Sequence, residues 1–478
     1  MNKSIRFGAV VSLLLIVALL VNYSVVQGMR EDEYAQDPHN SRILMELKRT
    51  NRGDIVAGDT VLAQSYRDEE TGFYQRAYPN MPWSFAPVVG YASDQFGTSQ
   101  LEATYNGELT GDSGTSSRFL RTGTEDGNKG DTVELTLDPS LQAFAFDQLA
   151  EPGYEGAVVA VRPSSGEVLA MASTPSYDPN GIANPATSED AWSQVNSNPA
   201  NPLLNHATQE QLPPGSIFKI ITTAAGLRNG YTPDSPLTGE AQIILPGTDN
   251  IPLTNYGGQA CAGGGQVPLS TAFALSCNTA FVQMGLAVGA DALRDAADRF
   301  GVGQSYDLGL PNAAGSLGEL PGGAELAQSA IGQRDVTMTA LQAAVMAATI
   351  ANKGKRMEPH VVRAVRNANG KVVKETKPVE LNEAVTEEEA ATITDLMYGS
   401  ERWSYGYDGN GYASKTGTAE HGPSDPYTLW FTGFAPADDP QVVVAVMVEN
   451  GGGLGQHGTS NGIAAPIAKK VIEAVLSR

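Results

Sequence analysis

The sequence has 478 residues, of which 41% are hydrophobic, and its formal net charge is −22. This length accommodates one large domain with one or two smaller ones. The acidic balance argues against a nucleic-acid partner, which would favour a basic surface, and against broad attraction to anionic lipid.

The N-terminal segment is hydrophobic enough to cross a membrane. Residues 7–26 form an uncharged, mostly apolar run, and a helix of that length spans roughly 30 Å, the thickness of a hydrocarbon core. Lys3 and Arg6 precede the run, so the N-terminus is expected in the cytoplasm and the rest of the chain outside it. A cleaved signal peptide is the alternative, but the residues after the run offer a poor cleavage site. We therefore predict that residues 1–29 are a cytoplasmic tail and single-pass anchor in the cell membrane.

Residues 30–131 are predicted to form a small, strand-rich, non-catalytic domain and a linker. Residues 51–56 and 61–63 are typical of two short strands around a turn, and residues 85–91 of another extended segment. Arg52 is expected to form a structural ion pair.

The linker is predicted at residues 107–130, which are rich in Gly, Ser, Thr and Asp. Phe119 and Leu120 would tether it to the surface. We place the main domain boundary near Asp131.

Residues 132–478 are predicted to be a large α+β domain. Strand patterns occur at 132–137, 156–161, 167–172, 412–419, 429–434 and 442–448, and helical patterns at 139–149, 216–227, about 268–352 and about 463–476. Strands at both ends of the segment, separated by a helical block, predict a sheet assembled from sequence-distant pieces. Residues 442–448 are almost wholly apolar, so this strand should be buried on both faces.

A serine and a lysine lie one helical turn apart after a rigid turn. Pro213, Pro214 and Gly215 suit the turn before a helix, which places Ser216 at or near the helix N-terminus and Lys219 on the same face. An amine beside a hydroxyl can make a serine nucleophilic without histidine. Taken alone, the pattern fits a capped helix with a solvated lysine better, because Ser-x-x-Lys is common by chance.

Two further segments favour the catalytic interpretation. Ser276-Cys277-Asn278 is a polar break between two apolar helical runs, and Lys415-Thr416-Gly417-Thr418 lies at a strand end. The glycine would let a substrate backbone approach closely. Each motif is weak alone, but Ser-x-x-Lys, Ser-x-Asn and Lys-Thr-Gly in this order and context indicate an acyl-transferring serine site.

On these motifs, and on residues 174–180 and 430–436, the sequence resembles the penicillin-binding proteins. The resemblance covers essentially the whole chain and is greatest to the short class B group called penicillin-binding protein A. It implies a penicilloyl-serine transferase fold, similar to β-lactamases, in which an antiparallel sheet is flanked by helices. Neither a glycosyltransferase domain before it nor appended repeats after it are expected.

The resemblance also implies a peptidoglycan D,D-transpeptidase. Ser216 would attack the carbonyl of a D-alanyl-D-alanine stem peptide. Lys219 would accept its proton, with a pKa depressed by burial and by Lys415. Ser276 would relay a proton to the leaving amine, and Asn278 would hold the substrate amide and Lys219.

The same resemblance assigns the third motif to substrate binding. Lys415 would supply positive charge beside Gly417, and the hydroxyls of Thr416 and Thr418 would bind the terminal carboxylate. The backbone N–H groups of Ser216 and Thr418 would form the oxyanion hole. The implied partners are stem peptides, β-lactams and division or elongation proteins, including a glycosyltransferase. No cofactor is implied.

The two cysteines, Cys261 and Cys277, are predicted to form a disulfide because the chain is exported and their number is even. Closing a loop of about 15 residues would contribute roughly 3 kcal/mol. Two buried free thiols are the alternative, and a nucleophilic Cys277 is a weaker one.

Other signals carry less weight. Residues 453–458 match a dinucleotide-binding glycine pattern, but no second strand can follow in the twenty residues that remain. They fit a flexible strand-to-helix loop better. The histidines at 39, 206, 360, 421 and 457 show no metal-ligand spacing, so no metal is predicted. His421 could line the cleft, although an exposed loop is the simpler interpretation.

Two other functions stay open. One is a related hydrolase, either a D,D-carboxypeptidase or a β-lactamase, although Glu380-Leu381-Asn382 is wrongly spaced to serve as the deacylating loop of class A β-lactamases. The other is a non-enzymatic scaffold or β-lactam sensor, against which the three intact motifs argue.

Overall fold

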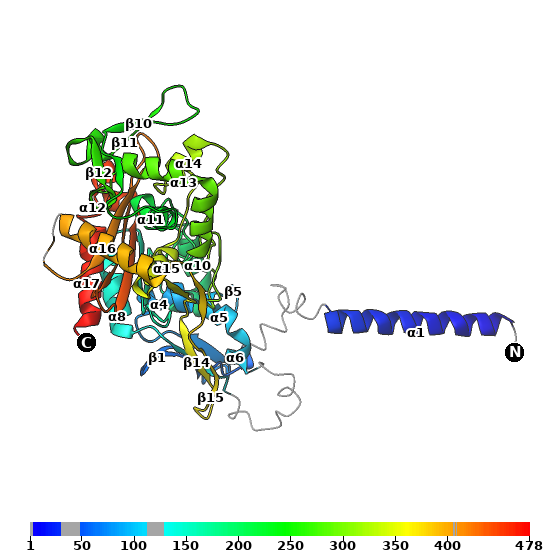
Figure 1. Cartoon of the computed structure of the whole chain (residues 1–478). Helices are drawn as coiled ribbons and strands as arrows, with labels where there is room; N and C mark the ends of the chain where they lie inside the picture. The colour runs from blue at the N-terminus through cyan, green and yellow to red at the C-terminus, as the bar shows by residue number, and fades with distance from the viewer. Residues whose placement is uncertain (1–2, 30–47, 112–128, 405–406, 408) are drawn as a thin grey trace.

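The computed structural model describes the chain except for residues 1–2, 30–47, 112–128, 405–406 and 408. Phe119 and Leu120, the predicted tether, lie outside the described residues, as does most of the predicted linker. The helices and strands are labelled in Figure 1.

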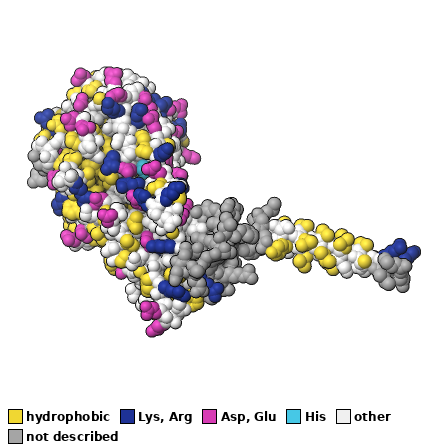
Figure 2. Space-filling model, turned by 90° about the horizontal axis from the view of Figure 1, so that it is seen from below, with side chains coloured by type: hydrophobic (Ala, Val, Ile, Leu, Met, Phe, Trp, Pro, Cys, Tyr) yellow, Lys and Arg dark blue, Asp and Glu magenta, His cyan; other side chains and the backbone are white. Residues whose placement is uncertain are grey.

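The first element, α1 (Lys3–Met29), is a long apolar helix. Its segment Arg6–Val25 has 20 residues with a mean hydropathy of 2.3, and none of it is buried. Figure 2 shows hydrophobic side chains along the length of this helix and basic side chains at its N-terminal end. In the part of the chain that the structure describes, it is the one helix long and apolar enough to cross a bilayer, which fits a single-pass anchor.

A six-stranded sheet contains most of the strands predicted near the N-terminus (Figure 1). In spatial order its strands are β15 (Val372–Glu375), β14 (Val362–Arg366), β6 (Thr132–Leu135), β1 (Ile55–Ala57), β2 (Thr60–Arg67) and β3 (Tyr74–Ala77). The antiparallel pair β1–β2 agrees with the prediction of two strands around a turn, but the first strand begins at Ile55, four residues later than predicted. Two strands from far along the chain, β14 and β15, complete the same sheet. The predicted boundary at Asp131 therefore lies between strands of one sheet and stays a prediction.

The extended segment predicted at residues 85–91 is wrong, because α4 (Pro82–Val89) is a helix. Proline suits the first turn of a helix, where its missing N–H costs nothing, and Pro82 stands there. Residues 84–89 are all buried, so the sequence lacks the alternation of polar and apolar residues that indicates an amphipathic helix. Around it lie β4 (Ala92–Ser93), β5 (Gly97–Thr98), α5 (Gln100–Thr104) and α6 (Asn106–Thr110).

The ion pair expected of Arg52 is present and buried. Arg52 Nη2 lies 2.7 Å from one oxygen of Glu102, and Arg76 Nε lies 2.6 Å from the other. Burial raises the pKa of Glu102, but the two guanidinium groups outweigh it and hold that pKa below its ordinary value. The network joins the segment before β1 to β3 and α5 and has a structural role.

The large domain is built on a five-stranded antiparallel sheet (Figure 1). Its strands in spatial order are β17 (Ala413–Ala419), β18 (Thr428–Ala435), β19 (Val442–Val448), β7 (Gly156–Val161) and β8 (Val168–Thr174). All neighbouring strands pair antiparallel. Every residue of β19 is buried, as its apolar sequence predicted.

Alternate residues of these strands face two helical layers. Val158 and Ala160 pack with α8 (Pro139–Ala150) and α17 (Ala464–Leu476), whereas Val159 packs with the helical block on the other face. That block consists of α11 (Lys219–Arg228), α12 (Leu269–Ala274), α13 (Asn278–Arg299), α14 (Gly323–Ser329), α15 (Ala340–Ala351) and α16 (Glu387–Trp403). The three-layer α+β arrangement agrees with the predicted fold.

Smaller elements connect these layers. They are α9 (Pro179–Ala183), α10 (Ser188–Asn196), β9 (Pro236–Thr238), β10 (Gln242–Ile244), β11 (Pro252–Thr254), β12 (Gln266–Pro268), β13 (Lys355–Met357) and β16 (Glu380–Glu383). The strand β17 is an edge of the central sheet, and the 3-10 turn η1 (Gly215–Phe218) packs against it.

Candidate active site

Two glycines bring the first and third motifs into backbone contact. Gly215 has a φ of +54°, and a Cβ there would lie 2.7 Å from the carbonyl oxygen of Thr418. A Cβ on Gly417 would lie 2.7 Å from the carbonyl oxygen of Pro214. Only glycine allows such an approach, so η1 packs directly on β17. Ser216 lies in η1, immediately before α11, which confirms its predicted place near a helix N-terminus.

The amine of Lys219 is fully buried and surrounded by acceptors from the second motif. Its Nζ lies 2.7 Å from the carbonyl oxygen of Ser276, 3.2 Å from Ser276 Oγ and 2.8 Å from Asn278 Oδ1. Within the described residues, no hydrogen bond joins Nζ to Ser216 Oγ, so the expected close pair is not a direct hydrogen bond here. The acceptors at the α12–α13 junction hold the amine toward that junction.

Ser276 links the two lysines of the site. Its backbone has a φ of +58°, a left-handed conformation that is uncommon outside glycine and concentrates at functional sites. This conformation turns the chain between α12 and α13. Ser276 Oγ lies 3.0 Å from Lys415 Nζ as well as 3.2 Å from Lys219 Nζ. One hydroxyl therefore contacts both amines.

Burial lowers the pKa values of both amines. Burial lowers the pKa of Lys415 to about 7. Burial, and then the charge of Lys415, lower the pKa of Lys219 well below its ordinary value of 10.5. These shifts favour a neutral Lys219 beside a Lys415 that keeps its charge below about pH 7.

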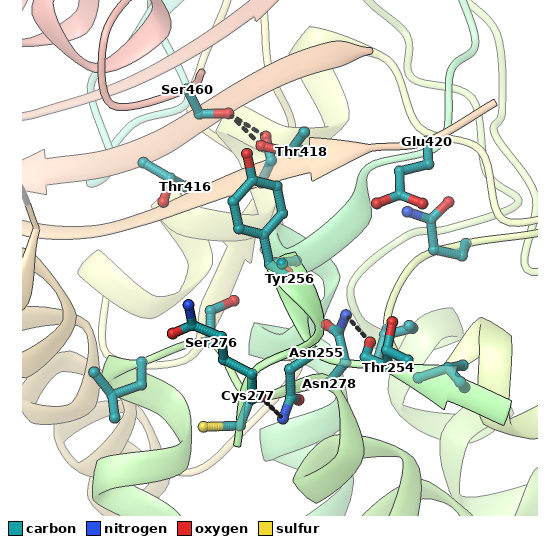
Figure 3. Close-up of a pocket in the computed structure, with 18 of the residues that line it drawn as sticks. Thr254, Asn255, Tyr256, Ser276, Cys277, Asn278, Thr416, Thr418, Glu420 and Ser460 are labelled. Carbon is teal, nitrogen blue, oxygen red and sulfur yellow. Dashed lines mark hydrogen bonds between the residues drawn. The ribbon is translucent and has the colours of Figure 1, made fainter. Parts of the chain in front are cut away.

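The three motifs meet at a cleft of about 1340 Å³ (Figure 3). The predicted residues on its wall are Ser216, Ser276, Asn278, Thr416, Gly417 and Thr418. Lys219 and Lys415 are buried against Ser276 and contact its hydroxyl. The structure therefore brings every predicted catalytic and substrate-binding residue to one place, while their roles remain proposals.

Ser460, in the loop before α17, was not predicted. Its Oγ lies 2.6 Å from the carbonyl oxygen of Gly417 and 3.1 Å from Thr418 Oγ1 (Figure 3). A carbonyl only accepts, so the single hydroxyl proton of Ser460 goes to Gly417. Thr418 must then donate its own proton to Ser460, and its lone pairs are left for the cleft. No sequence signal distinguishes this serine from its polar neighbours.

The loop after β11 supplies a second wall that sequence reasoning missed. Tyr256 is 64% exposed, and its ring points into the cleft (Figure 3). Asn278 Nδ2 donates to the carbonyl oxygen of Thr254 and fixes this loop against the second motif. Glu420 lies on the wall too, directly after β17. The loop has no motif of its own, so only its packing reveals it.

Cys261 and Cys277 are joined in the structure, with their Cα atoms 5.9 Å apart, a usual separation for a disulfide. The disulfide joins the loop after β11, which contains Tyr256, to the residue between Ser276 and Asn278. The sulfur of Cys277 is thereby unavailable as a nucleophile.

Residues 453–458 lie between β19 and α17 and contain parts of the 3-10 turns η4 (Asn450–Gly453) and η5 (Gly455–His457). His421 is exposed and also lines the cleft, with Nε2 2.7 Å from Thr428 Oγ1.

Comparison with known proteins agrees with this geometry. Residues 156–473 match the model of the penicillin-binding protein transpeptidase domain, and residues 52–133 match the penicillin-binding protein A dimerisation domain. The chain therefore belongs to the penicillin-binding protein transpeptidase family, as the motifs predicted.

Individual relatives are similar along the whole chain. The peptidoglycan D,D-transpeptidase PbpA of Mycolicibacterium smegmatis is 41% identical over 492 residues, covering 100% of this chain and 99% of that protein. The ceftriaxone acyl-enzyme of penicillin-binding protein A from Mycobacterium tuberculosis superposes with a TM-score of 0.85 at 40% identity, covering 90% and 99% of the two chains. Its penicillin G acyl-enzyme superposes with a TM-score of 0.84, also at 40% identity, covering 89% and 100%.

Proposed function

We propose that this peptidoglycan D,D-transpeptidase works through an acyl-enzyme on Ser216. The observation that carries the proposal is the buried Lys219–Ser276–Lys415 cluster beneath a cleft that contains Ser216. The acyl-enzymes formed by the Mycobacterium tuberculosis relative with penicillin G and ceftriaxone support a covalent step of this kind.

In the first half-reaction, Ser216 Oγ bonds to the carbonyl carbon of the penultimate D-alanine of a stem peptide. Its proton passes to neutral Lys219, for which a depressed pKa is required. The tetrahedral intermediate then expels the terminal D-alanine, and Ser276 relays a proton from Lys219 to the leaving amine. The contact between Lys219 Nζ and Ser276 Oγ supplies the path for that proton.

In the second half-reaction, the amine of another stem peptide attacks the acyl carbonyl. Its proton returns by the same groups, and Ser216 Oγ is released as a hydroxyl. The backbone N–H groups of Ser216 and Thr418 would stabilise the negative oxygen in both steps, since η1 packs directly against β17. β-Lactams enter the first half-reaction and stop there.

For the substrate carboxylate, the hydroxyl network favours Thr416 as the donor. Thr418 commits its proton to Ser460, and Thr416 has no such partner among the described residues. The Lys415 amine adds positive charge from beneath. Ser460 is then a positioning residue that sets the orientation of Thr418.

Replacing Ser460 with alanine is expected to lower the second-order rate constant for β-lactam acylation by about tenfold, because a hydrogen bond of about 1–1.5 kcal/mol that orders Thr418 and Gly417 is lost. The loss should appear mainly in the binding constant and not in the acylation step. Stopped-flow kinetics with a chromogenic cephalosporin separates the two terms. Thr459→Ala is the matched control, and equal rates for wild type and Ser460→Ala would refute the positioning role.

The test of the overall reaction is its product distribution. Incubation with a stem pentapeptide and an amine acceptor should release D-alanine and form cross-linked dimer, with dimer increasing at the expense of tetrapeptide as the acceptor concentration rises. Tetrapeptide alone would identify a D,D-carboxypeptidase, and rapid turnover of bound β-lactam a β-lactamase. A β-lactam adduct without any D-alanine release would identify a sensor or scaffold.

Two finer proposals concern the setting of the enzyme. The basic residues before the apolar segment of α1 support a cytoplasmic N-terminus and an extracytoplasmic catalytic domain. Because cross-linking acts on polymerised glycan strands, we also propose that the protein works with a glycosyltransferase among division or elongation proteins. Cysteine-accessibility labelling of intact cells would test the orientation.

A further inference from the structure

A second cluster of chemistry-bearing side chains lies outside the cleft and has no role in the mechanism above. It consists of His206, Glu210 and Glu449. The His206 side chain is only 6% exposed, and those of Glu449 and Glu210 are 21% and 26% exposed. His206 and Glu210 lie in the segment that leads to Ser216, and Glu449 directly follows β19.

The hydrogen bonds of the ring define its tautomer. His206 Nε2 lies 3.2 Å from the carbonyl oxygen of Ala200, which only accepts, so Nε2 carries a proton. Nδ1 lies 3.2 Å from Glu449 Oε1 and 3.9 Å from Glu210 Oε2. In a neutral ring, Nδ1 would therefore direct a lone pair at two carboxylate oxygens. Such an arrangement is stable only when a proton on Nδ1 or a bound cation lies between the ring and the carboxylates.

Nearby basic side chains do not provide that cation. Across the described part of the chain, the salt bridges of Glu210 and Glu449 involve His206 and no lysine or arginine. A third carboxylate, that of Glu155, lies in the segment just before β7 and accepts a hydrogen bond from Asn450 Nδ2.

We propose that His206 Nδ1, Glu210 and Glu449 bind a divalent metal ion, with zinc as the best match. One imidazole nitrogen and two carboxylate oxygens are a ligand set that zinc accepts, with bonds of about 2.0–2.2 Å and water in the remaining position. Tetrahedral geometry places such ligand atoms roughly 3.4 Å apart. The observed separations of 3.2 and 3.9 Å lie on either side of that value, and all candidate ligand atoms lie within 4.8 Å of one another.

The surroundings of the histidine match those of a metal ligand. Ligating histidines usually donate their other ring N–H to a carbonyl or carboxylate, which holds the ring in place, and Ala200 supplies that carbonyl. The backbone N–H of His206 also donates to Ser173 Oγ on β8. A metal here would join the segment before Ser216 to the end of β19, so its role is to stabilise this junction, without contact with the substrate.

This site was missed because its third ligand is distant. His206 and Glu210 stand four residues apart, but Glu449 is separated from His206 by 243 positions. The absence of a local ligand pattern led to the prediction of no metal.

The experiment uses the full-length protein in detergent, stripped by a chelator and titrated with zinc chloride against a chromophoric zinc indicator. We expect one equivalent of zinc per chain and a rise in Tm of about 3 °C or more, which EDTA reverses. Glu449→Gln and Glu210→Gln should each weaken binding by more than about 100-fold, because even indirect partners of a metal contribute 10- to 100-fold. His360→Gln, which changes a histidine elsewhere, should bind zinc like the wild type.

His206→Arg distinguishes metal loss from misfolding. The guanidinium group supplies a permanent cation toward both carboxylates, so the variant should fold, keep its β-lactam labelling and lose both zinc binding and the zinc-dependent Tm rise. Zinc binding that persists in His206→Arg would overturn the proposal. So would a folded wild type that takes up no stoichiometric zinc, in which case a protonated His206 is the cation.

Discussion

Replacing Ser216 with alanine is expected to abolish covalent labelling by a fluorescent penicillin, lowering the acylation rate by more than about 10⁴-fold. The side chain is the sole proposed nucleophile, because the neighbouring Ser276 hydroxyl is held between two lysines and Cys277 is bonded to Cys261. Removing one partly exposed oxygen leaves the contact between η1 and β17 intact, since that contact is made by backbone. Thermal unfolding should therefore be unchanged.

The measurement is in-gel fluorescence after denaturation, which removes non-covalent ligand. Ser197→Ala, at an exposed position at the end of α10, is the matched control and should label like the wild type. Equal labelling of wild type and Ser216→Ala, or an unlabelled wild type that is folded, would contradict the acyl-enzyme mechanism.

The second large effect is on the pH dependence of acylation. Lys219 accepts a proton only when neutral, and its pKa lies well below 10.5, so the rate should rise with pH on the acidic side as Lys219 loses its proton. Lys415 carries its charge only below its pKa of about 7, so the rate should fall again as the pH rises through that value. The expected profile is bell-shaped, with activity where Lys219 is neutral and Lys415 charged.

Stopped-flow acylation between about pH 5 and pH 9 tests this profile, and two substitutions assign its limbs. Lys219→Ala should lower the maximum rate by about 10²- to 10⁴-fold, the usual contribution of a general base. Lys415→Arg keeps a cation at every pH and should remove the falling limb, whatever its effect on the maximum. A rate that rises without a maximum to pH 9 would exclude the assigned role of Lys415.

The sequence determined those parts of the protein that depend on local signals. Apolar length identified α1, strand periodicity and composition identified the five central strands, and turn chemistry placed Ser216 before α11. The candidate catalytic residues were recognisable for the same reason. Each stands in a short segment whose form is set by adjacent residues, such as the two prolines and glycine before Ser216. The family comparison confirmed that the chain belongs to the penicillin-binding protein transpeptidase family.

Only the tertiary structure decided which distant segments meet. Because residues 84–89 of the helix α4 are all buried, their sequence lacks a polar face and resembled a strand. Strand pairing brought residues 362–375 into the N-terminal sheet, and loop packing placed Ser460 on Gly417. The tertiary structure also decided the protonation states of buried side chains. Sequence identifies Lys219 and His206 as titratable, but their protonation depends on buried partners from elsewhere in the chain, because desolvation and contact are properties of packing and not of sequence spacing.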